Sequence, residues 1–542
     1  MQIEIQKLKL FLIYFTLSVL VLYFVFAPAI HIPFYHHDIY KYSVGGFHNS
    51  CRNDPGFSYL FKLGRPFSAM LDCGGYKVAN SLNNVSHLRI LCVVLVAFAM
   101  SLFAFGLHSV KRFVWPVFFI SGAIFVLPAI QTTIIMTATT LVFSILMAFF
   151  AWYCLSKSYL FVAKQSASRK DVFYFLGGIG SLFISLFTYP SLSSCFLLPA
   201  FVCILFKSLS NWYAMKRTIL RDVIIFIISC SLYFIIAKLL QSKLSVVSSN
   251  YQFKLNFHFF DRIIFIYKHF PSLWMIHASF LQVALINLII LSGLVIALRN
   301  FFLSDFFKYK KNESIRVLLQ TLFAVIVLLL LGSLTLLAVP SDDIPIGRVI
   351  FVLQAMSILI LWWSLIRIGS LFSWKETHSA GLFAGLLFLI GAGVANYNMI
   401  TSALNDYLEF NYITTTLAKH FQAPAFKLKR IHIISPAAVN FNGLPRGDDI
   451  LNDNSTHYAG DLTYIVNAAF LQFVGKYQFS LINCIFSEID EERHFADEIR
   501  CMGSMPKNSI AVTYSRPEKP YYKTPDMLII DMNTLMLHKP TY

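Results

Sequence analysis

The chain has 542 residues, of which 57% are hydrophobic and only 13% are charged. Soluble domains usually contain about 45–50% apolar and about 25% charged residues, so the composition excludes an ordinary soluble protein and indicates a polytopic helical membrane protein. The formal net charge of +17 does not indicate nucleic-acid binding, because no basic domain stands apart from the hydrophobic runs. Lys and Arg instead mark cytoplasmic loops and anionic lipid surfaces.

The first element is an apolar run that ends at Ala29. A signal peptide has an apolar core of about 7–15 residues, whereas a spanning helix needs about 20. We therefore expect an uncleaved first transmembrane helix, Leu8–Ala29. Further apolar runs predict about eleven spans in total: His87–His108, Phe113–Pro128, Thr132–Leu155, Val172–Tyr189, Ser191–Phe206, Val223–Leu240, Ala278–Leu298, Val317–Val339, Val349–Ile366 and Ala380–Met399.

One boundary between these spans rests on a proline. Tyr189-Pro190 divides a long apolar stretch, and proline cannot continue a helix without disruption. We expect two spans here, and a single kinked helix is the alternative.

Lys and Arg recur in alternate loops, which predicts the orientation of the chain. With Lys7 and Lys9 in the cytoplasm, five successive basic loops also fall there: 111–112, 157–170, 207–221, 299–316 and 367–375. The loop 31–86, the loop 340–347 and everything after Tyr397 then lie outside. We expect a cytoplasmic N-terminus and a periplasmic C-terminal domain.

The composition changes after Met399. Asn405–Gln422 predicts a polar helix that leaves the membrane. Strand-like runs then alternate with helical patterns, which predicts a small α/β domain over residues 421–542. The expected strands are Ile431–Ser435, Tyr477–Phe486, Ile510–Tyr514 and Met527–Asp531, and the helical patterns are Leu462–Val474 and Glu491–Cys501.

Four cysteines fall in the segments expected outside, where an oxidising compartment permits disulfides. Cys51 and Cys73 lie in the first outer loop, and Cys484 and Cys501 lie in the terminal domain. Their even numbers are compatible with one disulfide in each segment, and equally with coincidence.

The first outer loop combines carboxylates with cations just outside the membrane. Asp38 follows the first span by about nine residues, and it can act as a general base toward a sugar hydroxyl. Asp54 is a second candidate catalytic acid. Lys41 and Arg65 are candidate phosphate-binding cations, and Arg can hold a phosphate through two parallel hydrogen bonds. A solvated loop Asp and an Arg that reaches the interface from a turn are the alternatives.

The loop that ends at Arg348 is a second candidate site. Arg348 begins a span at the outer face, so we expect it to have a partner, either a phosphate or Asp342 or Asp343. The two acids can also hold a divalent cation, and a surface ion pair is the alternative. Tyr189, at an outer helix end, can line a sugar pocket or simply accompany a helix cap.

These residues carry a resemblance. The pattern Asp38-x-x-Lys41 followed by Gly-Arg-Pro-Phe-Ser-Ala-Met-Leu (64–71) resembles the GtrII family of bacterial and phage glucosyltransferases, which modify O-antigen. Gly347-Arg348-Val349 and Asn405-Asp406-Tyr407 are similar to the same family. The resemblance covers roughly residues 1–420. The family usually has two acids where this chain has His37-Asp38, and Arg where it has Lys41.

The resemblance implies a GT-C-like fold in a bacterial inner membrane. It implies transfer of glucose or a related hexose from a polyprenyl-phosphate-linked donor to a lipid-linked glycan such as O-antigen at the periplasmic face. Asp38 would be the base, and Arg65 and Arg348 would bind the donor phosphate. Such a donor needs no nucleotide-binding domain, and no glycine-rich phosphate loop follows a predicted strand.

Two other classes remain open. A transporter or flippase usually places ionisable residues and broken helices near the membrane midplane, whereas the predicted spans here are nearly free of charge. A glycan polymerase would use similar outer loops and substrates. The terminal domain is expected to contact the acceptor, and a purely structural cap is the alternative.

Overall fold

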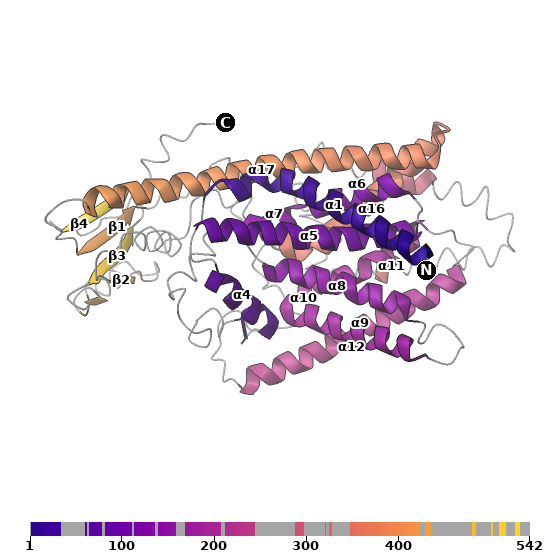
Figure 1. Ribbon diagram of the computed structural model, residues 1–542, viewed down its shortest axis with the longest axis horizontal. Coiled ribbons are helices and arrows are strands. Elements are labelled where there is room, and N and C mark those ends of the chain that lie inside the picture. Colours follow the sequence, from indigo (N-terminus) through magenta and orange to yellow (C-terminus); the bar gives the residue numbers. More distant parts are fainter. Residues whose placement is uncertain are drawn as a thin grey trace.

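The structure is a computed structural model, and it describes part of the chain. The described residues are 2–33, 60–61, 64–78, 82–110, 113–135, 139–158, 168–206, 212–243, 288–296, 320, 325–327, 347–421, 429–434, 480–483, 500–501, 504, 509–515 and 526–531. Long helices lie side by side in one bundle, with the N-terminus at one end and a small sheet beyond the other (Figure 1).

Seven helices in the described part are long and apolar enough to cross a membrane, or eight if a bent helix pair counts as one span. The protein is therefore a multi-pass helical membrane protein. The seven are α1 (Gln2–His31), α5 (Leu82–Val110), α8 (Thr139–Lys157), α9 (Arg169–Thr188), α12 (Trp212–Lys243), α16 (Gly347–Leu371) and α17 (Glu376–Phe421). The expected spans Ala278–Leu298 and Val317–Val339 are described only at 288–296, 320 and 325–327, which are helical.

The bent pair is α6 (Val114–Phe125) and α7 (Pro128–Ile135), which meet at 61°. Pro128 has no N–H to continue α6, and it is suited to the first position of a new helix. Gln131 Nε2 donates to the carbonyl of Val126 at 2.8 Å and so satisfies a group at the break. The expectation that Thr132 opens the next span is wrong, because residues 128–135 belong to this bent pair and α8 begins at Thr139.

The expected span Ser191–Phe206 is also irregular. It consists of α10 (Pro190–Ser193), the 3₁₀ helix η2 (Ser194–Leu197) and α11 (Leu198–Phe206). The predicted division at Tyr189-Pro190 is confirmed, since α9 ends at Thr188 and α10 begins at Pro190. The three pieces follow one another without a gap, so the expected run forms one apolar helix, Pro190–Phe206, that contains a 3₁₀ turn.

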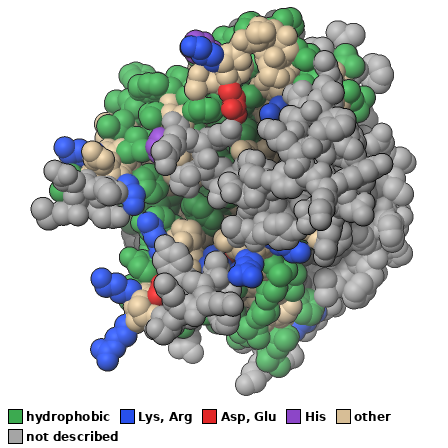
Figure 2. Space-filling model, turned by 90° about the vertical axis from the view of Figure 1, so that its right-hand side faces the viewer, with side chains coloured by type: hydrophobic (Ala, Val, Ile, Leu, Met, Phe, Trp, Pro, Cys, Tyr) green, Lys and Arg blue, Asp and Glu red, His purple; other side chains and the backbone are tan. Residues whose placement is uncertain are grey.

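Two side-chain contacts show that neighbouring long helices run in opposite directions, α1 beside α5 and α8 beside α9. Ser86 Oγ donates to Ile30 O at 2.9 Å, which joins the start of α5 to the end of α1. Ser158 Oγ donates to Asp171 O at 3.0 Å, which joins the end of α8 to the start of α9. Figure 2 views the end that holds the N-terminus, where Lys and Arg outnumber acidic side chains over the described surface.

A proline in α1 explains one contact with α17. Pro28 lies inside α1 and cannot donate to the carbonyl four residues earlier. Asn396 of α17 supplies donors there, with Nδ2 3.4 Å from Phe24 O and 2.9 Å from Val25 O. Asn398, two residues further along α17, donates from Nδ2 to Gln131 Oε1 of α7 at 3.0 Å. These asparagines therefore join helices to one another.

The expected exit helix is not separate. α17 continues from the membrane to Phe421 without a break, and the part after Leu404 extends about 25 Å at about 1.5 Å per residue. Figure 1 shows the sheet beyond this end of α17.

Four parallel strands form the sheet in the order β2-β3-β1-β4. The strands are β1 (Arg430–Ile434), β2 (Ser480–Asn483), β3 (Ser509–Ser515) and β4 (Met527–Asp531), close to the four predicted runs. Arg430, His432 and Thr513 are buried, and their side chains hydrogen-bond one another across β1 and β3. The helical patterns expected between the strands are described only at Arg500 and Cys501.

Candidate functional site

The predicted Gly-Arg-Pro motif forms a tight turn that begins helix α4 (Pro66–Val78). Gly64 has φ of +75°, a conformation that L side chains rarely adopt. The N–H of Gly64 donates to Phe61 O, and the N–H of Arg65 donates to Leu60 O, each at 3.0 Å. Pro66 follows as the first residue of α4, where a missing N–H costs nothing.

The turn packs directly on α12, which explains why glycine is needed. A Cβ at position 64 would lie 2.8 Å from Cβ of Ala237 and 3.4 Å from its Cα. α4 itself contacts α8 and α9, at the end of the bundle nearer the sheet (Figure 1). The motif therefore places Arg65 at a fixed point where α4, α9 and α12 meet.

Tyr189 is held at the same point by the break between α9 and α10. Pro190 favours an extended conformation in the residue before it, and Tyr189 has φ −148° and ψ 96°. Its N–H donates to Ser185 O at 2.9 Å. Ser144 Oγ, from α8, lies 3.0 Å from the carbonyl oxygen of Tyr189, within hydrogen-bonding distance.

Arg65 and Tyr189, both predicted from the sequence, are in contact. The guanidinium carbon of Arg65 lies 4.7 Å from the centroid of the Tyr189 ring. A cation over an aromatic face is stabilised by about 0.5–2 kcal/mol, depending on how far it is desolvated. Stacking uses the face of the guanidinium and leaves its N–H edge available to an anion.

That edge is unoccupied among the described residues. Arg65 is half-buried, its Nε is buried without a hydrogen-bond partner, and it forms no ion pair with a described acid. A buried donor without an acceptor costs about 1–3 kcal/mol, so a bound anion would stabilise this arrangement. The geometry can therefore hold a phosphate or carboxylate at the end of the bundle nearer the sheet.

The other predicted site residues cannot be placed beside this pair. Asp38, Asp54, Lys41, Asp342 and Asp343 lie outside the described residues. Arg348 is the second residue of α16, and its side chain is likewise not among those described. Their roles stay predictions. The described residues contain no group of three or more His, Cys, Asp or Glu side chains that could hold a metal ion.

Sequence reasoning missed a buried cation in α5. Arg89 is fully buried, and its guanidinium donates to Ala29 O at 3.1 Å and to Ile135 O at 3.3 Å. These carbonyls lie at the C-terminal ends of α1 and α7, where positive charge is favoured. Arg348 was singled out because it begins a span at the outer face. Arg89 lies at the same position in the expected span His87–His108, so the same criterion would have identified it.

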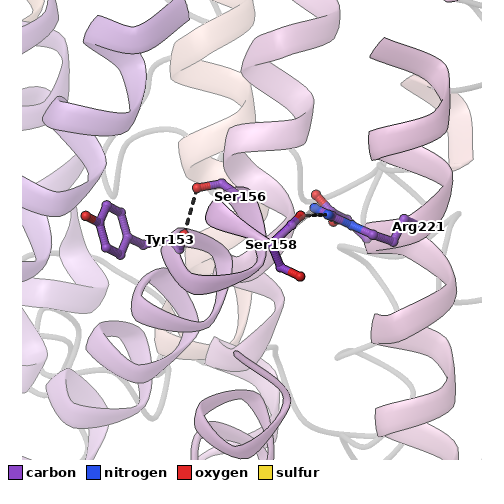
Figure 3. Close-up of polar contacts among 5 residues, drawn as sticks. Tyr153, Ser156, Ser158 and Arg221 are labelled. Carbon is purple, nitrogen blue, oxygen red and sulfur yellow. Dashed lines mark hydrogen bonds and ion pairs between the residues drawn. The ribbon is translucent and has the colours of Figure 1, made fainter. Parts of the chain in front are cut away.

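A buried ion pair lies at the opposite, basic end of the bundle. Arg221 Nη2 is 2.8 Å from Asp222 Oδ1, and both side chains are almost fully buried. Arg221 Nη1 also donates to Ser158 O at 2.9 Å and so ties α12 to the end of α8 (Figure 3). The expectation that the spans are nearly free of charge needs correction at Arg89. Arg221 was expected in the loop before the span Val223–Leu240, and the structure places it, together with Asp222, inside α12.

Two of the four outer cysteines are described, and both are disulfide-bonded. These are Cys73, which is buried in α4, and Cys501. Cys51 and Cys484, the partners suggested by their positions, lie outside the described residues. The disulfide bond of Cys73 adds a further constraint on α4, the helix that begins directly after Arg65.

Comparisons with protein families, with curated proteins and with solved structures find no match to this chain.

Proposed function

We propose that the protein is a membrane glycosyltransferase that moves glucose or a related hexose from a polyprenyl-phosphate-linked donor to a lipid-linked surface glycan. The acceptor hydroxyl attacks the anomeric carbon of the donor sugar while Asp38 takes the hydroxyl proton. The bond from the anomeric carbon to the phosphate oxygen breaks, and polyprenyl phosphate leaves. A GT-C-like arrangement is part of this proposal, as the resemblance to the GtrII family implies.

The observation that carries the proposal is the Arg65 site. A half-buried guanidinium, stacked on Tyr189 and without an acidic partner among the described residues, lies among apolar helices. A lipid-linked phosphate has the charge and the membrane location to match it. Charge develops on that phosphate as the bond breaks, and a preorganised cation stabilises such charge.

The orientation follows from the positive-inside rule. The end of the bundle with most described Lys and Arg residues is assigned to the cytoplasm, so the Arg65 turn and the sheet face the periplasm of a bacterial inner membrane. α17 would then carry the C-terminal α/β domain about 25 Å beyond the membrane, within reach of a long acceptor glycan. A cysteine introduced at Ser168 should resist an impermeant label, and one at Asn454 should react.

Substitution at Arg65 tests the proposal. Arg65→Ala should raise the apparent KM for a polyprenyl-phosphate-hexose donor by about tenfold or more, because hydrogen bonds to charged groups contribute about 1.5–3 kcal/mol. The donor KM of Arg65→Lys should lie between those of the wild type and Arg65→Ala, since lysine keeps the charge but lacks the planar guanidinium. Arg217→Ala, an exposed cation at the opposite end, is the matched control. Unchanged donor KM in Arg65→Ala would remove Arg65 from the donor site.

A second candidate function is a flippase or transporter of lipid-linked glycans, with a glycan polymerase as a related possibility. The bent pair α6–α7 favours it, because interrupted helices often form transport sites within membranes. Mass analysis of surface glycans from cells with and without the gene separates these functions. An added hexose that depends on the gene and is lost in Asp38→Asn supports the transferase, whereas altered glycan amount or length without a missing hexose supports the alternatives.

A further inference from the structure

A second arginine, Arg367, has no acceptor or acid for its side chain among the described residues, and it lies in the last turns of α16 at the basic end of the bundle. The guanidinium carbon of Arg367 is 5.5 Å from the centroid of the Trp363 ring. Arg367 Nε is buried and has no hydrogen-bond partner, and Trp363 Nε1 is buried and unbonded as well. The two side chains are four residues apart, so they lie on the same face of the helix.

No acid among the described residues neutralises Arg367. Arg221 pairs with Asp222 and Lys429 pairs with Asp526, and no ion pair joins Arg367 to a described acid. Lys375, a few residues further on, is exposed and adds positive charge. Glu376, the next residue, is an exposed acid that offsets the charge of Lys375. The positive charge of the site is therefore that of Arg367, beside which two buried donors have no acceptor among the described residues.

The turn from α16 to α17 supplies exposed apolar side chains beside this charge. Leu371, Phe372 and Trp374 are all exposed. The rings of Phe372 and Trp374 lie 5.9 Å apart, and Trp374 stacks on Phe383 at 6.2 Å. Trp, whose ring is apolar but carries a polar N–H, is enriched at the headgroup level of membranes.

We propose that Arg367 and Trp363 bind the phosphate of an anionic phospholipid headgroup, with Phe372 and Trp374 beside the lipid. The guanidinium can donate two parallel hydrogen bonds to a phosphate, and the indole N–H supplies a third. Basic sites between helices on the cytoplasmic side of membranes recognise anionic headgroups in this way. Exposed apolar side chains favour a lipid over a free phosphate, because only the lipid brings chains to cover them.

This site is distinct from the proposed donor site. Arg367 lies near the end of α16 that turns into the start of α17, where Trp362 Nε1 donates to Ala380 O at 3.0 Å. Arg65 lies where α4 meets the end of α9, at the opposite end of the bundle (Figure 1). Lipid binding at Arg367 can therefore hold or fail independently of sugar transfer.

Thermal unfolding of the purified full chain in an uncharged detergent tests the proposal. Phosphatidylglycerol, phosphatidylcholine and inorganic phosphate are titrated separately, and the unfolding midpoint is followed. Phosphatidylglycerol should raise the midpoint of the wild type clearly more than the other two. Arg367→Gln should raise the apparent dissociation constant for phosphatidylglycerol by about tenfold or more.

Matched variants make the result specific. Arg217→Gln removes an exposed charge from the same end of the bundle and should titrate like the wild type. Arg367→Lys should lose part of the affinity, and Trp363→Phe, which keeps a ring but loses the N–H, should lose a few-fold. These two milder variants also serve if Arg367→Gln does not fold.

Several outcomes would overturn the proposal. Equal losses in Arg217→Gln and Arg367→Gln would show only general surface electrostatics. Equal stabilisation by phosphatidylcholine would exclude recognition of an anion, and equal stabilisation by inorganic phosphate would exclude a lipid as the specific ligand. Wild-type titration in Arg367→Lys and Trp363→Phe would show that neither side chain contacts the headgroup.

Discussion

Replacing Gly64 with Ala should disturb both the packing of α4 and the position of Arg65. An L-residue in the left-handed region costs about 1–2 kcal/mol, and Gly64 has φ of +75°. The new Cβ would also lie 2.8 Å from Cβ of Ala237, and overpacking of this kind costs about 1–3 kcal/mol. The native turn therefore loses roughly 2–5 kcal/mol relative to conformations that move Arg65 away from Tyr189.

Two measurements follow this displacement. The unfolding midpoint of the purified protein should fall, and the apparent KM for a lipid-phosphate-sugar donor should rise. If about 1.4 kcal/mol of this cost favours conformations in which Arg65 is displaced, the fraction of molecules with Arg65 in its native position falls about tenfold. The apparent affinity for the donor falls by the same factor.

Two further variants separate the causes. Gly74 lies in α4, the helix that follows the Gly64 turn, and a Cβ there would meet nothing within 4 Å. In Gly74→Ala, donor KM should therefore not change, and stability should stay equal or rise slightly. The double variant Gly64→Ala with Ala237→Gly removes the collision but keeps the backbone strain, and it should recover part of the loss. An unchanged midpoint in Gly64→Ala, or equal damage from Gly74→Ala, would refute the reasoning.

Two other substitutions probe helix packing and the buried charges, each read as a change in unfolding midpoint. Gly293→Ala would place a Cβ 2.4 Å from Cβ and 2.6 Å from Cα of Ser364, so the free energy of unfolding should fall by about 1–3 kcal/mol or more. Gly385→Ala is the control, because a Cβ there meets nothing within 4 Å, and its stability should not change. Equal effects of the two substitutions would contradict the close contact at Gly293. Asp222→Asn leaves the buried Arg221 without its counter-ion and should cost about 3–5 kcal/mol, whereas wild-type stability would mean that the pair is solvated.

Hydrophobic runs determined most of the fold that is described. Helices such as α5, α9 and α16 lie where apolar stretches predicted them, because a membrane-spanning helix needs about 20 predominantly apolar residues in a row. The strands of the sheet also fall on the predicted runs. The boundary near Pro128 was mispredicted, because hydropathy continues there while the backbone N–H needed for a helix is missing. The break at Pro190 was predicted from its proline, and only the 3₁₀ turn at Ser194–Leu197 was not.

The candidate site was predictable only in part. Gly64 and Pro66 indicated that Arg65 is held by a fixed turn, since glycine permits a positive φ and proline restricts φ. Its neighbour Tyr189 was suggested by position alone. Their contact depends on how α4 packs against α9 and α12, which are distant in the sequence.

Hydropathy alone therefore indicated a multi-pass membrane protein, and Gly64 and Pro66 marked Arg65 as a candidate, because hydrophobicity and backbone restriction are properties of single residues and short segments. Only the tertiary structure decided which groups Arg65, Arg89 and Arg367 meet. A charge in an apolar bundle is stabilised by the carbonyls, rings and acids that helix packing brings near it, and one-dimensional patterns do not contain those distances.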